Sequence, residues 1–390
     1  MAMSFKVIKL LVVLIAVLSF SGICSADQVN LTPAFNIDAA HSDNIYFADD
    51  NSPAKQSDTY VVYNPGINVE VATNKTVLSA SYQLGVERFN TFDERNNSIH
   101  RIDGNLGYKP SKRWALDVID NFAYTTDPLA FDASGDRVQR GGYKYNHFTP
   151  GMYYSFPGRS VRVGARYERI DIDYKDQVLI DSYQNGFHGG IDYQINNKTT
   201  LSFDYNEFKR VFKQQTPLVD DYRGRNFAAI LDRRISSRTS LKFMGGYDKR
   251  DFKKGTPTAD WSGGVYGLEF VGEFPEFFSI QIGYVRRFND LAAFGVFRVD
   301  KIETTFKRNF ADRLSIAVGA FYQKNRNDQI SVVGRNQIDK FSGARIVGEF
   351  MVAKFLALHA GYEYLMRDSN IINSFTENRF IFGLGLSYGL

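Results

Sequence analysis

The chain contains few combinations of side chains that could carry out catalysis. Its histidines are scattered, and none has a neighbour in a metal-binding spacing such as H-x-x-x-H. The acid pairs Asp49-Asp50 and Asp220-Asp221 stand among turn-forming residues, where solvated carboxylates are the simpler interpretation. We therefore expect neither an enzyme nor a cofactor or metal site. The histidines are His41, His100, His147, His188 and His359.

Charged residues at alternate positions are more informative. In stretches with strand-like alternation, basic and acidic residues recur on one face, as Arg162, Arg166 and Glu168 do. Neither sign dominates, so strong anion or cation selectivity is not expected. Two compatible interpretations remain: salt bridges that brace a hollow wall, and a mixed-charge passage for a hydrated, uncharged or weakly charged solute. The candidate lumen-lining residues are Arg162, Arg166, Glu168, His188, Asp192, Lys242, Asp248, Arg250, Lys301, Glu303, Lys307, Arg345, Glu349 and Glu363.

A recurring short sequence predicts the elements that carry these residues. In each copy, an apolar residue is followed by a tight polar turn and then by a strand in which apolar residues alternate with small or polar ones. The copies lie about forty residues apart, which is the period of a run of long hairpins. Two all-β architectures have this spacing, a propeller of four-stranded blades and an up-and-down barrel. Clear copies begin at Ile195, Ile235 and Phe310, and looser ones at Val71, Tyr108, Phe156, Phe274 and Val352.

Composition and alternation favour a barrel in a membrane. Aromatic residues make up 15% of the chain although its mean hydropathy is −0.30. A membrane barrel presents apolar side chains to lipid only at alternate positions, so both values are typical of it. Leu78, Ala80 and Tyr82, for example, alternate with Ser79 and Ser81. The formal net charge of +4 is spread without blocks of one sign, which gives no track for nucleic acid.

Eight tight turns imply nine hairpins if both chain ends lie on the periplasmic side. We therefore expect a single antiparallel up-and-down barrel of about 18 transmembrane strands over residues 27–390, with 16 as the alternative. Its turns would be short on the periplasmic side and longer on the extracellular side. The expected long loops are 46–57, 90–97, 126–140, 173–181, 212–222, 251–260, 288–292, 326–338 and 368–376.

Both ends of the chain predict export to the bacterial outer membrane. Residues 1–26 have two lysines, a short apolar run and the small-residue site Cys24-Ser25-Ala26, which predicts a cleaved secretory signal peptide. From Arg379 onward, aromatic and aliphatic residues alternate with glycines and Ser387. This pattern is similar to the terminal strand by which the barrel assembly machinery recognises outer-membrane barrels, so we expect that machinery and outer-membrane lipid as partners.

The first third of the chain also resembles a known family. Thr32-Pro33-Ala-Phe-Asn-Ile, Asn64-Pro65-Gly66-Ile67 and the stretch Asp117 to Pro128 resemble the type-two outer-membrane β-barrel porins. That resemblance implies a barrel of about eighteen strands, encoded with exopolysaccharide systems, that passes a polymer outward with a separate periplasmic polysaccharide export protein.

Two functions from different classes remain open. The main hypothesis is an exopolysaccharide export conduit, in which the polymer occupies the lumen. The alternative is a general diffusion porin for small hydrophilic solutes, and a structural or adhesive barrel occluded by its loops is a lesser one.

Overall fold

The computed structural model describes residues 28–126, 142–158, 160–175, 181–214, 221–252, 260–274, 278–291, 295–310, 313–332, 335–370 and 374–387. Within these ranges lie eighteen strands and the short 3₁₀-helix η2 (Asp93–Arg95). The strands are β1 (Gln28–Ser42), β2 (Asp58–Ala72), β3 (Thr76–Phe89), β4 (Asn97–Tyr108), β5 (Trp114–Thr125), β6 (Tyr143–Ser155), β7 (Val161–Tyr174), β8 (Ser182–Asn196), β9 (Thr199–Phe212), β10 (Tyr222–Arg234), β11 (Thr239–Phe252), β12 (Trp261–Phe274), β13 (Phe278–Leu291), β14 (Gly295–Phe310), β15 (Leu314–Val332), β16 (Arg335–Ala353), β17 (Leu356–Ser369) and β18 (Phe375–Ser387).

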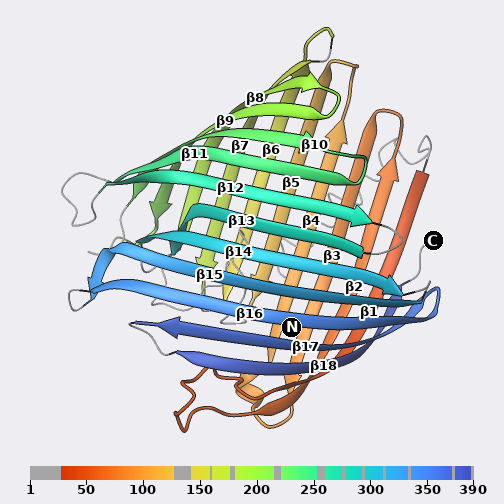
Figure 1. The fold of residues 1–390 in the computed structure, drawn as a ribbon, viewed down its shortest axis with the longest axis vertical. Coiled ribbons are helices and arrows are strands. Elements are labelled where there is room, and N and C mark those ends of the chain that lie inside the picture. The colour runs from red at the N-terminus through yellow and green to blue at the C-terminus, as the bar shows by residue number, and fades with distance from the viewer. Residues whose placement is uncertain are drawn as a thin grey trace.

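The strands form one antiparallel sheet that closes on itself. Each strand pairs with its neighbours in sequence, and β1 also pairs with β18, from Ala34↔Ser387 to Ser42↔Arg379. Figure 1 shows β11–β18 crossing in front of β2–β5, so that two walls enclose a space. The predicted 18-stranded up-and-down barrel is confirmed, and the sixteen-stranded and propeller alternatives are wrong.

Side-chain alternation separates the two faces of this barrel. Phe187 and Phe382 are 68% and 61% exposed, and each is followed by a residue of the opposite face, His188 and Gly383. Large apolar side chains are exposed on the outer face all around the sheet. Such a surface is stable only against lipid, where a closed ladder also satisfies every backbone hydrogen bond.

The connections differ at the two ends of the barrel. Tight turns such as 73–75, 197–198 and 354–355 join strands at one end, as predicted. The connections at the other end include longer ones, such as 43–57. We call these the short-turn end and the long-loop end.

Two predicted loops are wrong. Residues 288–291 of the predicted loop 288–292 are the end of β13. Residues 326–338 were expected to connect two strands, but β15 continues to Val332 and β16 begins at Arg335. The polar residues in and before this stretch resemble a loop in sequence, yet they satisfy one another on the sheet. Gln323 donates to Asn325 and Gln337 donates to Asp339, at 2.8 and 2.9 Å. Because these polar side chains satisfy one another's hydrogen bonds, the two strands can continue into a polar stretch.

No helix among the residues that the structure describes is long and apolar enough to cross a membrane. The expected signal peptide, residues 1–26, lies outside the described residues and stays a prediction.

Candidate functional site

The fourteen residues named above share the inner face of the barrel. Arg166 and His188 pair directly across β7 and β8, and Phe187, beside His188, is exposed on the outer face. Glu303 has the same relation to the exposed Ile302. That a solute passes these residues remains a prediction. They are carried by β7 (Arg162, Arg166, Glu168), β8 (His188, Asp192), β11 (Lys242, Asp248, Arg250), β14 (Lys301, Glu303, Lys307), β16 (Arg345, Glu349) and β17 (Glu363).

Arg162 and Asp192 form an ion pair across two neighbouring strands. The Arg162 Nε and Nη2 atoms lie 2.8 and 2.6 Å from Asp192 Oδ2. Ser202 on β9 donates a hydrogen bond to the other carboxylate oxygen at 2.7 Å. The Arg162 guanidinium and the Ser202 hydroxyl together hold the Asp192 carboxylate at the wall. The two charges there offer a hydrated surface of mixed sign.

Glu168 lies between two histidines on the same face. Its Oε2 is 3.1 Å from His188 Nε2 and 3.3 Å from His147 Nε2, and Gln184 donates to its Oε1 at 2.6 Å. His147 was not among the predicted lumen residues, although its position in the alternation of β6 would have placed it there. Within the described ranges, no group of three His, Cys, Asp or Glu side chains is arranged to hold a metal ion.

A second group lies buried near the long-loop end of β10 and β11. Asp248 Oδ1 is 3.2 Å from Arg250 Nε, and the Arg250 guanidinium donates to the Tyr222 hydroxyl at 3.2 Å. The Phe208 ring lies under this guanidinium, 5.6 Å from its carbon atom. Lys242, nearer the short-turn end, stands directly across from acidic residues on β10 and β12. Residues of opposite charge therefore stand next to one another on this wall, as the bracing interpretation requires.

The strands that close the barrel carry a third group. Arg345 Nε is 3.1 Å from Glu363 Oε1, and Arg379 of β18 binds the other oxygen of the same carboxylate. His359 pairs with Asp38 of β1. Neither Arg379 nor Asp38 was predicted, because an up-and-down barrel brings the first and last strands together but the sequence does not give the register in which they pair.

The remaining predicted residues lie on β14 and β16. Lys301 Nζ lies 2.9 Å from Glu303 of the same strand. Lys307 stands across from Ser279 and Ala317, and Glu349 across from His359. Lys307 and Glu349 lie toward the short-turn end, where the inner face is more open.

Side chains crowd the inner face at the long-loop end. Phe297, Phe341 and Phe375 are fully buried there, and so are polar residues such as Gln323 and Asn325. A side chain on an inner wall is buried only when others lie over it. The space inside the barrel is therefore narrower at the long-loop end than at the short-turn end.

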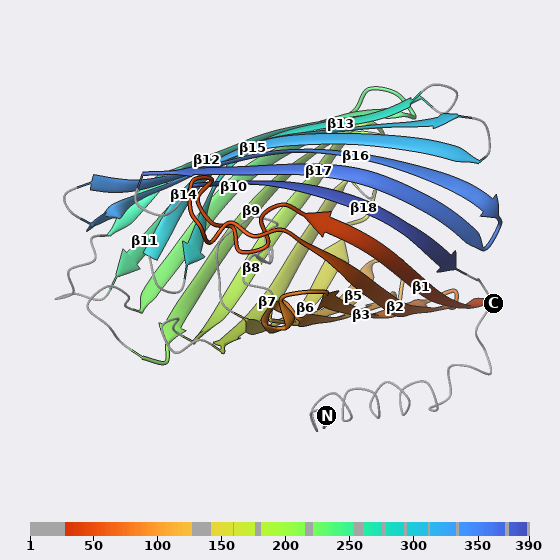
Figure 2. The same ribbon diagram turned by 90° about the horizontal axis from the view of Figure 1, so that it is seen from below.

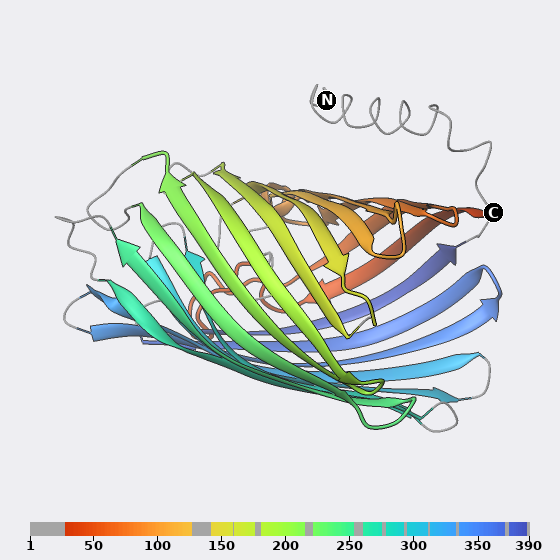
Figure 3. The same ribbon diagram turned by 90° about the horizontal axis from the view of Figure 1, so that it is seen from above.

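The segment 43–57, which connects β1 to β2, contributes to this narrowing. Asn44 is 0% exposed, and its side-chain amide donates to the carbonyls of Ala48 and Thr376, each at 2.8 Å. Asp43 accepts hydrogen bonds from the backbone and side chain of Asn378, both at 2.7 Å. In Figures 2 and 3 this reddish segment lies between the two walls of the barrel. The loop is thus fastened to β18 and folded inward.

Phe47 anchors the same loop. Its backbone has φ of 52°, which is rare for a bulky side chain and stores strain. The ring packs 5.3 Å from that of Phe375 and against the buried Leu365. The guanidinium of Arg95 lies 5.8 Å from the Phe47 ring, which connects this loop to the 90–96 connection. Burial of the ring is what offsets the strained backbone.

Titratable groups add electrostatic contacts to the loop. The Lys55 ammonium, 2.8 Å away, together with the Thr376 hydroxyl holds the pKa of the Asp50 carboxyl below its usual value. The hydrogen bond from the Tyr46 hydroxyl likewise lowers the pKa of Glu94. Both contacts favour the ionised carboxylates, so the loop is held best when these groups are charged.

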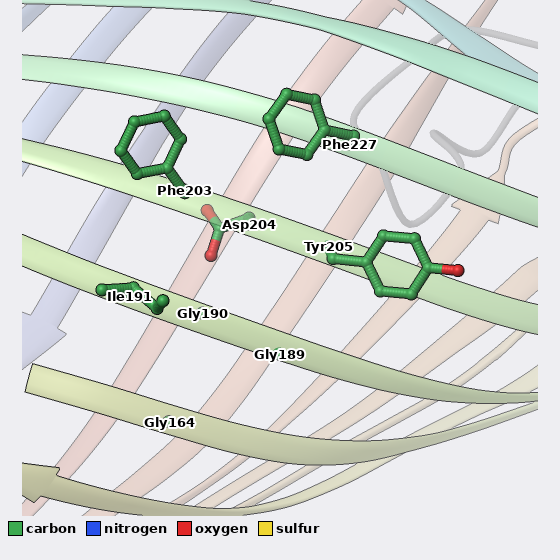
Figure 4. A pocket seen from close by; sticks show the side chains of 8 residues that line it. All are labelled: Gly164, Gly189, Gly190, Ile191, Phe203, Asp204, Tyr205 and Phe227. Atoms are coloured by element: carbon green, nitrogen blue, oxygen red, sulfur yellow. The ribbon is translucent and has the colours of Figure 1, made fainter.

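A shallow hollow of about 390 Å³ lies on the outer side of β8–β10 (Figure 4). Gly189 leaves open space there, between the outward-facing rings of Phe203, Tyr205 and Phe227. Its lining is almost entirely apolar, so it suits lipid rather than a hydrophilic solute.

One serine has the spacing of a hydrolase nucleophile. Gly385-Leu-Ser387-Tyr-Gly389 matches G-x-S-x-G, but that pattern requires a sharp turn from a strand to a helix. Ser387 instead ends β18, pairs with Ala34 and donates its backbone N–H to Phe355. The match is a consequence of strand alternation.

The comparisons agree with this fold. No protein-family model and no curated protein matches the chain, so the resemblance to the type-two porins gains no support. Solved structures match over nearly its whole length. The outer membrane protein OpdK of Pseudomonas aeruginosa is 9% identical over 93% of this chain and 100% of that chain, with a TM-score of 0.50. OpdQ of the same organism is 11% identical over 94% and 98%, at 0.52, and OccAB4 of Acinetobacter baumannii is 12% identical over 94% and 99%, at 0.51.

At these identities the likeness establishes the fold alone. The chain has the closed 18-stranded barrel of bacterial outer-membrane proteins, as the sequence predicted. That the protein is not an enzyme stays an expectation from the sequence.

Proposed function

We propose that this protein is an outer-membrane channel for small hydrophilic solutes. The observation that carries the proposal is the contrast between an apolar outer face and an inner face of paired charges, such as Arg162 with Asp192. A barrel of eighteen strands is too wide for its own wall side chains to fill. Water therefore occupies the remaining space, and solutes diffuse along the mixed-charge wall.

The narrowing at the long-loop end favours small solutes. The 43–57 segment and buried side chains such as Phe341 reduce the space there. Among the structures that share the fold, OccK2 of Pseudomonas aeruginosa has been solved with glucuronate and OpdK with vanillate. Solutes of that size are the range that we propose for this channel.

The exopolysaccharide conduit that the sequence resemblance implied has less support. The aromatic rings at the long-loop end pack on one another, as Phe208 and Tyr222 do at 6.0 Å between centroids, instead of forming an open row on which sugars could stack. The periplasmic export partner was part of that hypothesis and has equally little support. Insertion by the barrel assembly machinery through β18 remains a prediction.

Reconstitution of the purified full-length protein tests the proposal. We expect steady conductance steps in planar bilayers, and swelling of proteoliposomes in monosaccharides that declines sharply for oligosaccharides. Barrels that insert but conduct no ions and pass no sugar would contradict it. Selective passage of long polysaccharide with negligible monosaccharide flux would instead restore the export hypothesis.

A further inference from the structure

A row of charged residues crosses the outer face near the long-loop end. Successive strand pairs place Arg286 of β13 across from Asp300 of β14, Asp300 across from Lys324 of β15, and Lys324 across from Lys340 of β16. Lys340 is in turn across from Asp368 of β17. Directly opposed residues lie on the same face, so these side chains form one line around the outside of the barrel.

A second pair of cations lies beside this row. Arg298 and Arg326 are directly opposed on β14 and β15, two positions closer to the loops. We call Arg286, Arg298, Lys324, Arg326 and Lys340 the basic patch. Two of its directly opposed pairs, Arg298↔Arg326 and Lys324↔Lys340, are of like charge, an arrangement that destabilises a sheet unless anions compensate it.

The acidic residues of the patch compensate only part of its charge. Asp300 lies 2.5 Å from Arg286 Nε and 3.7 Å from Arg298 Nε, and it also accepts from the Tyr284 hydroxyl. Asp368 lies 2.9 Å from Lys340 Nζ. Among the described residues, Lys324 has no acidic partner at ion-pair distance. Among the described residues, Asp300 thus serves Arg286 and Arg298, Asp368 serves Lys340, and Lys324 adds a further positive charge.

The position of the patch indicates what compensates the rest. The next residues toward the short-turn end on the same face are Tyr284, Ile302 and Tyr322, and the row beyond includes Ile282. Tyrosines above an aliphatic belt mark the level where the hydrocarbon ends. The patch therefore lies at headgroup depth, in contact with the lipid and outside the lumen.

We propose that the basic patch binds the phosphate groups of a phosphorylated glycolipid in the surrounding outer leaflet, with the acyl chains against the apolar belt below. Guanidinium groups suit phosphate oxygens because they donate two parallel hydrogen bonds, and ammonium groups add point charge. From β13 to β16 the patch spans about 14 Å, given strand spacings of about 4.8 Å, so it has room for more than one phosphate. A lipid-anchored ligand is favoured over free phosphate because the cations border the belt.

Thermal unfolding of the full-length barrel in detergent tests this proposal with three additives: bisphosphorylated lipid A, the same lipid with its phosphates removed, and inorganic phosphate. We expect only the intact lipid to raise the midpoint at micromolar concentration. An equal shift with the dephosphorylated lipid would overturn the role of phosphate. An equal shift with inorganic phosphate would overturn the lipid source.

A pair of substitutions tests the residues. Lys324→Gln with Lys340→Gln should weaken the apparent affinity for the phosphorylated lipid about thirtyfold, since each basic residue near a membrane surface contributes roughly one factor of five. Without lipid, the same variant should unfold at the same or a higher midpoint, because a like-charge pair is removed. The matched control is Arg308→Gln, on the outer face near the short-turn end. Unchanged affinity in the double variant would overturn the proposal, whatever the outcome of the conductance experiments.

Discussion

Asp38 and His359 form a hydrogen bond over Gly383, and this contact joins the first strand to the last two. Asp38 of β1 and His359 of β17 are each directly opposite Gly383 of β18. Because Gly383 has no side chain, the two longer side chains meet over it on the inner face. This contact ties three strands together at the closure of the barrel, where the partners are 321 residues apart in sequence.

Gly383→Ala should therefore destabilise the barrel. A Cβ atom at this position would lie 1.9 Å from Asp38 Oδ1, 2.6 Å from His359 Nε2 and 2.7 Å from the Ile37 carbonyl oxygen. Overpacking of this kind costs about 1–3 kcal/mol, and here it also breaks the hydrogen bond between Asp38 and His359. Urea unfolding in lipid vesicles, followed by tryptophan fluorescence, would measure the loss.

Gly189→Ala is the matched control for that experiment. Gly189 also lies on a strand, but a Cβ there would have no atom within 4 Å. The free energy of unfolding of this variant should stay within about 0.5 kcal/mol of that of the parent protein, as for most surface substitutions. Equal destabilisation by both substitutions would mean that replacing a strand glycine is itself destabilising. The contact between Asp38 and His359 over Gly383 would then not be the cause.

Glu168→Gln should destabilise the barrel and shift its ion selectivity. The substitution removes the charge that lies between His147 and His188, while a neutral amide can still accept from Gln184. Loss of charge-assisted hydrogen bonds at a largely buried carboxylate costs about 1–3 kcal/mol. The removal of one negative charge from the inner face should move the reversal potential in a salt gradient toward anion preference.

Glu303→Gln separates these two effects. The Glu303 side chain is 54% exposed, and within the described part of the chain its ion pair is with Lys301 of the same strand. Its substitution should shift the reversal potential in the same direction with a stability change of at most about 1 kcal/mol. A large loss of stability here, or none for Glu168→Gln, would contradict the difference in burial that we assign.

The sequence predicted most of the fold and the face of each predicted inner residue, because both follow from a two-residue period and from the turns. Glu168 and His188 could be placed on one face in this way. The contact between Asp38 and His359 could not, because it depends on the register in which the first strand pairs with the last, and no short turn fixes that register. The inward position of the 43–57 segment was equally inaccessible: Asn44 and Asp43 resemble ordinary turn residues until β18 is beside them.

Asn44→Ala should release the 43–57 segment and raise the conductance of the channel. The substitution leaves the carbonyls of Ala48 and Thr376 and the backbone N–H of Ala48 without their partner, at a cost of about 1–3 kcal/mol. Since this segment narrows the long-loop end, its release should increase single-channel conductance or add a larger conductance level. Planar bilayer recordings would show either change.

Asn51→Ala is the control in the same loop. Asn51 is exposed, and its recorded hydrogen bond, to Asp49, uses the backbone N–H and not the side chain. Its recordings should match those of the parent protein. If Asn44→Ala also leaves conductance unchanged, the segment does not limit the passage.

Acid should release the same loop. The Lys55 ammonium and the Thr376 hydroxyl lower the pKa of Asp50 when the loop is docked. A carboxyl whose pKa is lowered on docking stabilises the docked state above its ordinary pKa, about 4, and loses this contribution as pH falls through the lowered value. Glu94, whose pKa the Tyr46 hydroxyl lowers, acts in the same direction. Conductance should therefore stay constant from pH 7 to 5 and rise below about pH 4.

Two substitutions test whether Asp50 is the group responsible for the rise in conductance at low pH. Asp50→Asn removes the charge that Lys55 and Thr376 contact, so its conductance at pH 7 should approach the acid value and vary less with pH. Asp49→Asn changes the neighbouring carboxyl, for which no contact to Lys55 or β18 is recorded in the described residues, and it should keep the full pH response. A pH response that persists unchanged in Asp50→Asn would place the titrating group elsewhere and remove Asp50 from the docking of the loop.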